Sequence, residues 1–500
     1  MKYRHTKYIR TATLLSFLLL ITSLSSCKKF LDLKPRDVKV LRTAEDYRDI
    51  MGSFLRFFKT ANPSQQGKIM GIDEYAFPRM DNSYQLGIYT GETSLKNEPP
   101  FVDNNTKLFT TTGRNLLTWN ETQHLKWEQD FKFLGGINLV INSIDESIGE
   151  DQRLKDRVKG EALTWRAYTL FKLLQLYCPY HDDAYGLPLY LDPSLNVGVA
   201  MPERETLTTT YAQIIGDAEA ALKLLERTRS TEWNLAYRPE FLHGMLAAVY
   251  LFKAGSGAAA PEDYAKAREH AVIAIGQRKP ESDPERIKKL FDVSNIEAAQ
   301  AFQSDEFTVR IIDGQNGLIM RYSHYLHEVG NGQTTVPFRS LYSDTDKRGP
   351  IFLKDNATIT KWGITGKTYY GYGIAMPFRL AELILIKAES EAKMGKESDA
   401  IATLKEFTDA RYTVSQPEPL TSQDLLAQIY LERKREFFCE NDYIWLDMKR
   451  LDEELYREVD DDLYVLKPRD YRYTLPIPAS EFRTNKKMVQ NPGWENVLIR

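Results

Sequence analysis

Apolar residues recur at helical spacing along much of the chain, and polar residues occupy the opposite faces. An apolar residue that returns every three or four positions is typical of an amphipathic helix. The pattern predicts helices over 131–147, 151–177, 211–225, 241–253, 264–275, 378–394, 398–410 and 422–438. Gly395 is a predicted helix stop, and Ser398 and Ser422 are predicted N-caps of the last two helices.

The helices near the C-terminus carry the spacing of a tetratricopeptide-type hairpin. Ala388, Gly395, Ala400 and Leu404 occupy its small, turn, small and large positions. Small residues let two helices approach closely and a large residue fills the neighbouring groove, so such pairs stack into a solenoid. We therefore expect a mainly α fold of tetratricopeptide-like helix pairs, an α-α superhelix, with long loop-rich insertions and minor β hairpins.

The first 30 residues carry the features of an export signal. Basic residues precede an apolar run over 12–24, and small residues then lead to Cys27. At ~1.5 Å per residue the run spans roughly 20 Å, short of the ~30 Å hydrocarbon core of a bilayer. The sequence therefore predicts a signal peptide over 1–26 rather than a transmembrane anchor. Because Cys27 follows small residues as in a bacterial lipobox, we predict that it is lipidated and anchors the protein to a membrane.

Charge and cysteine content narrow the possible functions further. The formal net charge is −3, so no basic footprint indicates binding to nucleic acid. Besides Cys27 the chain has only Cys178 and Cys439, too few for a disulfide framework. These two cysteines either form one bridge in an oxidising compartment or pack as buried thiols.

Three tracts lack clear helical periodicity, namely 61–123, 277–360 and 361–376. Structureless loops beyond ~15 residues are uncommon in compact domains unless they serve a function. A sugar presents flat apolar faces ringed by hydroxyl groups, so a glycan site needs exposed aromatic rings beside polar side chains. The first tract fits best, and its predicted ligand-binding residues are Arg79, Asn82, Tyr84, Tyr89 and Trp119.

The later tracts also contain aromatic residues, for which packing of the loop is the competing interpretation. They are Tyr322, Tyr325, Tyr342, Trp362, Tyr369, Tyr370 and Tyr372.

Two apparent cofactor motifs fail on inspection. The segment 366–368 (GKT) ends like a phosphate-binding loop, but Lys361 stands where that motif requires glycine. His324 and His327 lie one helical turn apart without an evident third ligand. We therefore predict neither a cofactor nor a metal site.

Several segments resemble the SusD/RagB family of outer-membrane nutrient-binding lipoproteins. They include the mature start CKKFLDLKP, the helix that begins GEALTWRAY, the stretch IYLERKREFFCE and the closing PIP and QNPG. The matches run from 27 to 494 in the order and spacing typical of the family. The chain departs from the family pattern at Cys178, where glycine is frequent, and at Cys439.

The resemblance implies a lipid-anchored, surface-exposed protein of the cell outer membrane. Such proteins capture oligosaccharides, or peptides in some branches, and deliver them to a TonB-dependent (SusC-like) outer-membrane barrel. The expected organisation is an N-terminal SusD-like region over 27–230 and a C-terminal SusD/RagB-like region over 231–500, packed as one globular unit. The expected activity is binding rather than catalysis.

The last long predicted helix carries a group of closely spaced charged residues. Glu432, Arg433, Arg435 and Glu436 stand three or four residues apart, which favours pairing within the helix. We interpret them as structural.

A surface glycosidase is a less favoured alternative function, because no motif singles out two carboxylates at ~5–10 Å. A pure interaction scaffold is the third hypothesis, since helical repeats commonly present protein-binding surfaces.

Overall fold

The computed structural model describes residues 41–59, 90, 92, 124–192, 201–228, 238–291, 320–323, 336–354, 358–361, 372–375, 379–417, 421–440, 442–459 and 462–495. Its longer helices are α3 (Ala44–Lys59), α5 (His124–Ser143), α6 (Gln152–Tyr177), α7 (Leu207–Arg227), α8 (Pro239–Lys253), α9 (Asp263–Ile275), α14 (Leu380–Lys393), α15 (Glu397–Arg411) and α16 (Ser422–Glu436). The predicted mainly α fold is confirmed.

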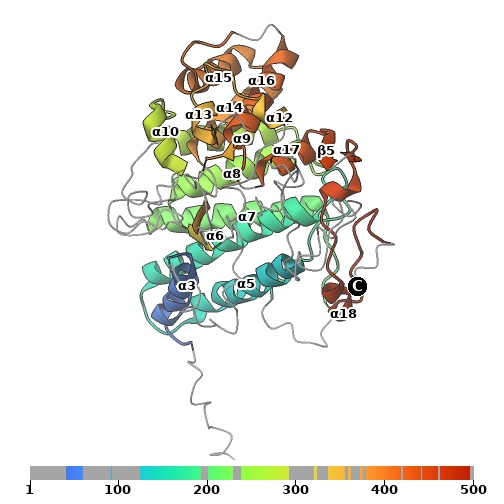
Figure 1. The fold of residues 1–500 in the computed structure, drawn as a ribbon. Coiled ribbons are helices and arrows are strands. Elements are labelled where there is room, and N and C mark those ends of the chain that lie inside the picture. The colour runs from blue at the N-terminus through green and yellow to red at the C-terminus, as the bar shows by residue number, and fades with distance from the viewer. Residues whose placement is uncertain are drawn as a thin grey trace, which may run out of the picture.

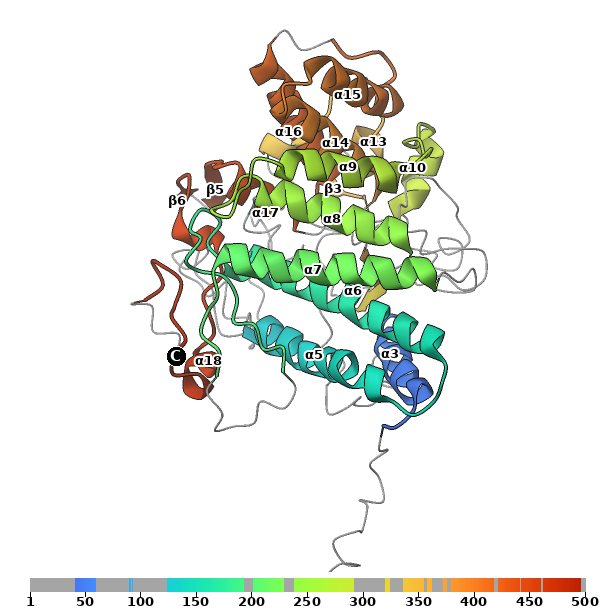
Figure 2. The same cartoon turned by 180° about the vertical axis from the view of Figure 1, so that it is seen from behind.

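Helices that follow one another along the chain lie side by side. Figures 1 and 2 show α5, α6, α7, α8 and α9 stacked in that order, with α14, α15 and α16 continuing the stack beyond α9. α3 packs on α6 at the opposite end. The arrangement is that of tetratricopeptide-like helix pairs, each of which buries its apolar face against its neighbours.

Shorter elements complete the described chain. The short helices are η5 (Ile144–Glu146), α10 (Pro284–Phe291), α12 (Val336–Arg339), α13 (Gly349–Phe352), α17 (Tyr443–Arg450), η7 (Tyr471–Tyr473) and α18 (Ala479–Thr484). The strands form antiparallel pairs, β1 (Met320–Ser323) with β4 (Tyr372–Ala375), β2 (Leu353–Lys354) with β3 (Thr358–Ile359), and β5 (Leu455–Val459) with β6 (Asp462–Leu466). The predicted loop-rich tract 277–360 contains α10, α12, α13 and three short strands among its described residues.

α6 is the central helix of the first half of the stack. The Asp151 carboxylate caps its start by accepting the Leu154 N–H at 2.9 Å, and a proline two residues beyond its last residue prevents its continuation. Arg166 joins three layers, because it donates to both carboxylate oxygens of Asp217 on α7 at 2.7 and 2.6 Å and to Asn138 on α5 at 3.1 Å. This pairing satisfies an arginine that is almost completely buried.

The α14–α15 hairpin confirms the predicted tetratricopeptide spacing. Ala388 and Ala400 are fully buried where the two helices approach, and Leu404 packs in the same apolar cluster. Gly395 has a φ of 73°, which L side chains rarely adopt, and it ends α14 as predicted.

The two predicted N-caps are wrong by one or two residues. Thr421 caps α16, because its hydroxyl accepts the Asp424 N–H at 3.1 Å. Ser422 is the first residue of that helix, and its own hydroxyl donates to Glu397. The tight turn at Gly395 lets α15 begin at Glu397, so Ser398 already lies in the first turn.

Two apolar clusters form the interior. The larger includes residues from Ala44 to Trp494, and the smaller joins α14, α15 and α16.

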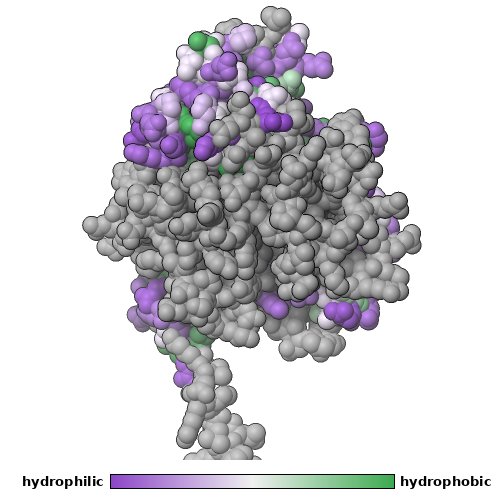
Figure 3. All heavy atoms as spheres, viewed as in Figure 1, coloured by the Kyte–Doolittle hydropathy of each residue, from purple (hydrophilic) through white to green (hydrophobic). Residues whose placement is uncertain are grey.

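The boundary at residue 230 between the two predicted regions stays a prediction. The described surface at the α15 end is largely hydrophilic (Figure 3).

Two further outcomes concern the cysteines and the membrane. Cys178 and Cys439 are two separate buried thiols, so the alternative of a bridge between them is wrong. Within the described ranges, no helix combines the length and apolar character needed to cross a bilayer.

Candidate functional site

The predicted ligand-binding residues and the predicted lipid site lie outside the described residues. They are Cys27, Arg79, Asn82, Tyr84, Tyr89 and Trp119. The same holds for the segment 366–368, for His324 and His327, and for Tyr325, Trp362, Tyr369 and Tyr370. Their roles stay predictions.

The second and third aromatic tracts meet in a strand pair. β1 and β4 run antiparallel, with Ser323 opposite Tyr372 and Tyr322 opposite Gly373. The backbones of Tyr322 and Tyr372, which the sequence separates by 50 residues, are therefore neighbours. Sequence periodicity does not reveal this pairing because each strand has only four residues.

Tyr342 packs into the protein rather than standing out as a ligand platform. Its hydroxyl donates to the Arg435 carbonyl oxygen at 2.8 Å, and its ring meets Phe352 and Phe438 at centroid distances of 6.0 and 6.4 Å. For this aromatic residue, loop packing is the correct interpretation.

Glu92 connects the first aromatic tract to the turn that follows α16. Its carboxylate accepts the Cys439 N–H at 2.6 Å and the Thr90 hydroxyl at 2.6 Å. Cys439 has a φ of 51°, so the turn is in the left-handed region where it meets Glu92. Burial raises the pKa of Glu92. The tract of the predicted ligand-binding residues is thus fastened to the helical core at this point.

A buried cluster of charges surrounds Glu436 at the end of α16. The carboxylate accepts from Arg379 Nη1 at 2.6 Å, from Arg411 Nε and Nη2 at 2.9 and 3.1 Å, and from Arg348 Nη1 at 3.1 Å. The three arginines are fully buried. Burial alone raises the pKa of Glu436, but the guanidiniums of Arg411, Arg379 and Arg348 outweigh it and hold that pKa well below its usual range.

Further ion pairs extend this cluster on both sides. Arg348 donates to Glu432 at 2.6 Å and to Asp346 at 2.8 Å. On the other side, Arg379 and Lys361 both donate to Glu440, at 2.7 and 2.9 Å. Each acid therefore has a cationic partner, which is the condition under which buried charges are tolerated.

The expected pairing within the helix is confirmed for one pair and wrong for the others. Arg435 donates to Glu432 at 2.7 Å, three residues away. Glu436, however, pairs with arginines from other elements, and Arg433 donates to Asp447 on α17 at 2.8 Å. Ion pairs to other elements replace pairs within the helix, because a buried carboxylate is stabilised more by several guanidiniums than by one partner at the surface.

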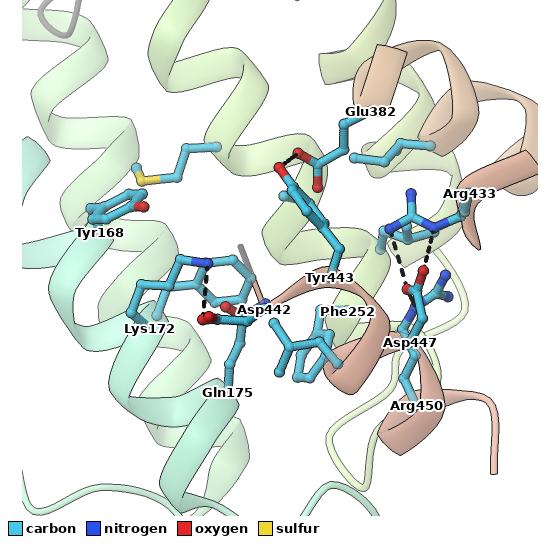
Figure 4. Close-up of a pocket in the computed structure, with 16 residues that line it drawn as sticks. Tyr168, Lys172, Gln175, Phe252, Glu382, Arg433, Asp442, Tyr443, Asp447 and Arg450 are labelled. Carbon is cyan, nitrogen blue, oxygen red and sulfur yellow. Dashed lines mark hydrogen bonds and ion pairs between the residues drawn. The ribbon is translucent and has the colours of Figure 1, made fainter. Parts of the chain in front are cut away.

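A small polar cavity lies where α6, α8, α14, α16 and α17 meet (Figure 4). The Tyr443 hydroxyl donates a hydrogen bond to the Glu382 carboxyl group. Arg433 pairs with Asp447 at the other end of the cavity. Lys172 lies 4.0 Å from the Asp442 carboxylate. Burial, only partly offset by Arg433, raises the pKa of Glu382 to about 7.

The cavity is too small to hold a sugar. Its volume is about 50 Å³, whereas sites for small-molecule ligands usually measure ~300–1,000 Å³. This cavity is therefore not a sugar site, and the predicted ligand-binding residues of the tract 61–123 stay a prediction.

Three buried carboxylates at the C-terminal helices, those of Glu432, Glu436 and Asp447, are arranged for structure rather than for acid–base chemistry. Despite burial, arginine neighbours lower the pKa of Glu432 and Glu436, and the same effect lowers the pKa of Asp447. A general acid instead needs a raised pKa. Among the described residues, no group of three or more His, Cys, Asp or Glu side chains forms a metal site.

Comparisons with protein families match two parts of the chain. The model described as the SusD family matches residues 342–494. The model described as "Starch-binding associating with outer membrane" matches residues 64–251. No curated protein matches the chain.

Several solved structures share this architecture. A SusD-like carbohydrate binding protein from Bacteroides vulgatus has a TM-score of 0.65 and 20% identity, with 90% of this chain and 98% of that chain covered. A SusD superfamily protein from Bacteroides thetaiotaomicron has a TM-score of 0.66 and 19% identity, with 90% and 100% covered. One from Bacteroides fragilis has a TM-score of 0.62 and 20% identity, with the same coverage. At these identities the likeness establishes the fold.

The stacked helix pairs define a protein of the tetratricopeptide-like helical class, with long insertions between the helices. The two family matches then place it more narrowly, and the chain belongs to the SusD family.

Proposed function

We propose that the protein is a cell-surface nutrient-binding lipoprotein that captures oligosaccharides and delivers them to a TonB-dependent (SusC-like) outer-membrane transporter. The main support is the family match over residues 64–251, whose description names both starch binding and the outer membrane. That segment contains all five predicted ligand-binding residues, Arg79, Asn82, Tyr84, Tyr89 and Trp119.

The helical stack suits a binding role because packed helices are a rigid support for the long tracts between them. Binding residues are often carried on loops that a rigid scaffold positions. Here the Glu92 carboxylate fastens the first aromatic tract to the turn at Cys439. The β1–β4 pair brings the backbones of the second and third tracts together.

The proposed lipid anchor would keep the binding site close to the membrane. Leu41 is the first described residue and follows Cys27 by 14 residues, a stretch that spans at most ~50 Å when fully extended. Acyl chains on Cys27 would hold the domain within this distance of the bilayer surface.

The arginine-paired state of three buried carboxylates favours binding over catalysis. In the described part of the C-terminal helices, Glu432, Glu436 and Asp447 are each held by arginines. A peptide-binding role within the same family is the second candidate, and a surface glycosidase is the third.

Ligand binding by the tract 61–123 is tested by affinity electrophoresis against oligosaccharides and polysaccharides, with a peptide panel in parallel. We expect Tyr84→Ala, Tyr89→Ala and Trp119→Ala each to weaken binding roughly threefold to tenfold, from the ~0.5–1.5 kcal/mol that an aromatic contact contributes. Tyr471→Ala is the control, because Tyr471 is 40% exposed but lies in the C-terminal segment. Equal effects of all four variants would refute the assignment of the site.

Anchoring is tested separately by labelling cells with a palmitate analogue. We expect the wild-type protein to carry the label and to fractionate with the outer membrane. Cys27→Ser should abolish labelling and release the protein from the membrane fraction. An unlabelled wild-type protein would refute the anchor.

A further inference from the structure

The polar cavity of Figure 4 contains two buried groups that lack partners. Gln175 Oε1 on α6 and Arg433 Nη1 on α16 have no hydrogen-bond partner among the described residues, although both side chains are more than nine-tenths buried. Both residues line the cavity. Leaving a buried polar atom unsatisfied is unfavourable, so two such residues at one cavity indicate that something polar occupies it.

The remaining polar groups of the cavity indicate the same. The Lys172 ammonium and the Asp442 carboxylate are 4.0 Å apart, which is too long for a direct hydrogen bond and leaves room for a water molecule to bridge them. The cavity volume of about 50 Å³ accommodates a few water molecules, since each needs roughly 10–15 Å³ by this kind of measure.

The mixture of donors and acceptors selects water over an ion. Gln175 Oε1 is an acceptor and Arg433 Nη1 is a donor. A chloride ion would satisfy only the donor, and a cation would satisfy only the acceptor. Water can serve both groups at once.

We propose that this cavity is an internal hydration site, in which a small cluster of water molecules bridges Gln175 and Arg433 and carries the exchangeable proton of Glu382. In the protonated state the acid holds its proton on the carboxyl group. On deprotonation the O–H bond breaks, the proton passes to a cavity water and onward to solvent, and the carboxylate remains. Tyr443 donates to the Glu382 carboxyl group in the structure, and this contact can persist in both states.

The charged neighbours of Glu382 come from three of the helices packed around it. Arg433 on α16 and Lys172 on α6 favour its ionised form, and Asp447 on α17 opposes it. Asp442 and Arg450 also line the cavity, whereas α8 contributes only Met245, Ala248, Leu251 and Phe252. Because burial outweighs the two cations, the pKa of Glu382 rises to about 7. This puts the proton exchange near neutral pH.

The sign of the pH effect follows from linkage. The folded state holds the Glu382 proton up to about pH 7, whereas an unfolded glutamate loses its proton near ~4.3. Stability therefore falls as the pH rises from ~4.5 to ~7, by up to tenfold in the unfolding equilibrium constant per pH unit. Glu382→Gln, which mimics the protonated acid, should remove this component.

The first test is a high-resolution crystal structure of the protein, with a second crystal soaked in bromide. We expect ordered water within hydrogen-bond distance of both Gln175 Oε1 and Arg433 Nη1, and no anomalous bromide signal in the cavity. A bromide ion on Arg433, or a direct bond that closes the cavity, would overturn the hydration site.

The second test is urea unfolding between pH 5 and pH 8 for the wild-type protein and Glu382→Gln. The variant should gain stability relative to wild type as the pH rises, by ten- to a hundredfold in the unfolding equilibrium constant. Infrared spectra should show a carboxylic-acid band at pH 6 that this variant lacks.

Glu161→Gln is the matched control, because burial also raises the pKa of Glu161 on α6 to about 7 away from the cavity. That variant should keep the ordered cavity water and the Glu382 band. A constant stability difference between Glu382→Gln and wild type across this pH range would overturn the proton site.

Discussion

Neutralising Glu436 tests whether the buried charge cluster holds the C-terminal helices together. In Glu436→Gln one oxygen still accepts two of the four arginine hydrogen bonds. The other oxygen is replaced by an NH₂ group that faces two guanidinium donors. If Oε2 is replaced, these are the donors at 2.9 and 3.1 Å, and if Oε1 is replaced, they are the donors at 2.6 and 3.1 Å. The change therefore loses two charge-assisted bonds and leaves buried positive charge uncompensated.

The expected cost is large by the standard of single substitutions. Removing one partner of a buried ion pair typically costs ~3–5 kcal/mol, and we expect about 4 kcal/mol here because Asp346, Glu432 and Glu440 still neutralise part of the charge. The measurement is the free energy of unfolding from urea denaturation, followed by circular dichroism. Because the pKa of Glu436 is far below its usual range, the loss should be the same at pH 6 and pH 8.

Glu406→Gln is the control for this prediction. Glu406 pairs with Lys279 at the surface, where the two side chains are 44% and 74% exposed, and exposed pairs contribute ~0–1 kcal/mol. If Glu436→Gln cost less than 1 kcal/mol, like the control, the cluster would not be what stabilises this end of the stack.

Three further predictions concern a histidine pair, a turn and the thiols. His243 on α8 and His270 on α9 lie with their Nδ1 atoms 2.8 Å apart. Burial and then His243 lower the pKa of His270 to about 4, so stability should fall as the pH drops from ~6.5 towards 4. His270→Gln should flatten this decline in urea titrations, and an unchanged slope would exclude the pair as its cause. Gly395→Ala should cost ~1–2 kcal/mol because its φ is 73°, whereas Gly135→Ala in mid-helix should stabilise by ~0.5–1 kcal/mol; thermal melts that rank the two variants the other way would contradict the assigned backbone. Both remaining cysteines are buried, so a thiol reagent should modify the Cys27→Ser protein only after denaturation, at two sites; fewer than two would indicate a bridge.

The long helices could be predicted from the sequence because their apolar period is strong. The structure has α6 at Gln152–Tyr177 where 151–177 was expected, and Asp151 is its N-cap. The eight-residue helices α10 and α17 were not predicted, since two turns give too few apolar repeats to stand out. The tight turn at Gly395 also moved the N-cap of α15 by two residues, and the N-cap of α16 is Thr421 rather than Ser422.

The partners of the buried charges could not be predicted from local spacing. Arg348 and Arg379 precede Glu436 by 88 and 57 residues and reach it only after α14 and α16 have packed. The free polar atoms of Gln175 and Arg433 emerge in the same way, because they come from helices far apart in the sequence. The predicted ligand-binding residues lie outside the described part of the chain, and the binding of their alanine variants tests them.

The most direct test of the proposed function is isothermal titration of the purified protein with defined oligosaccharides, followed by chromatography of the recovered sugar. The account predicts saturable binding to at least one oligosaccharide and recovery of that sugar intact. Cleavage of the sugar, or saturable binding to peptides alone, would contradict it.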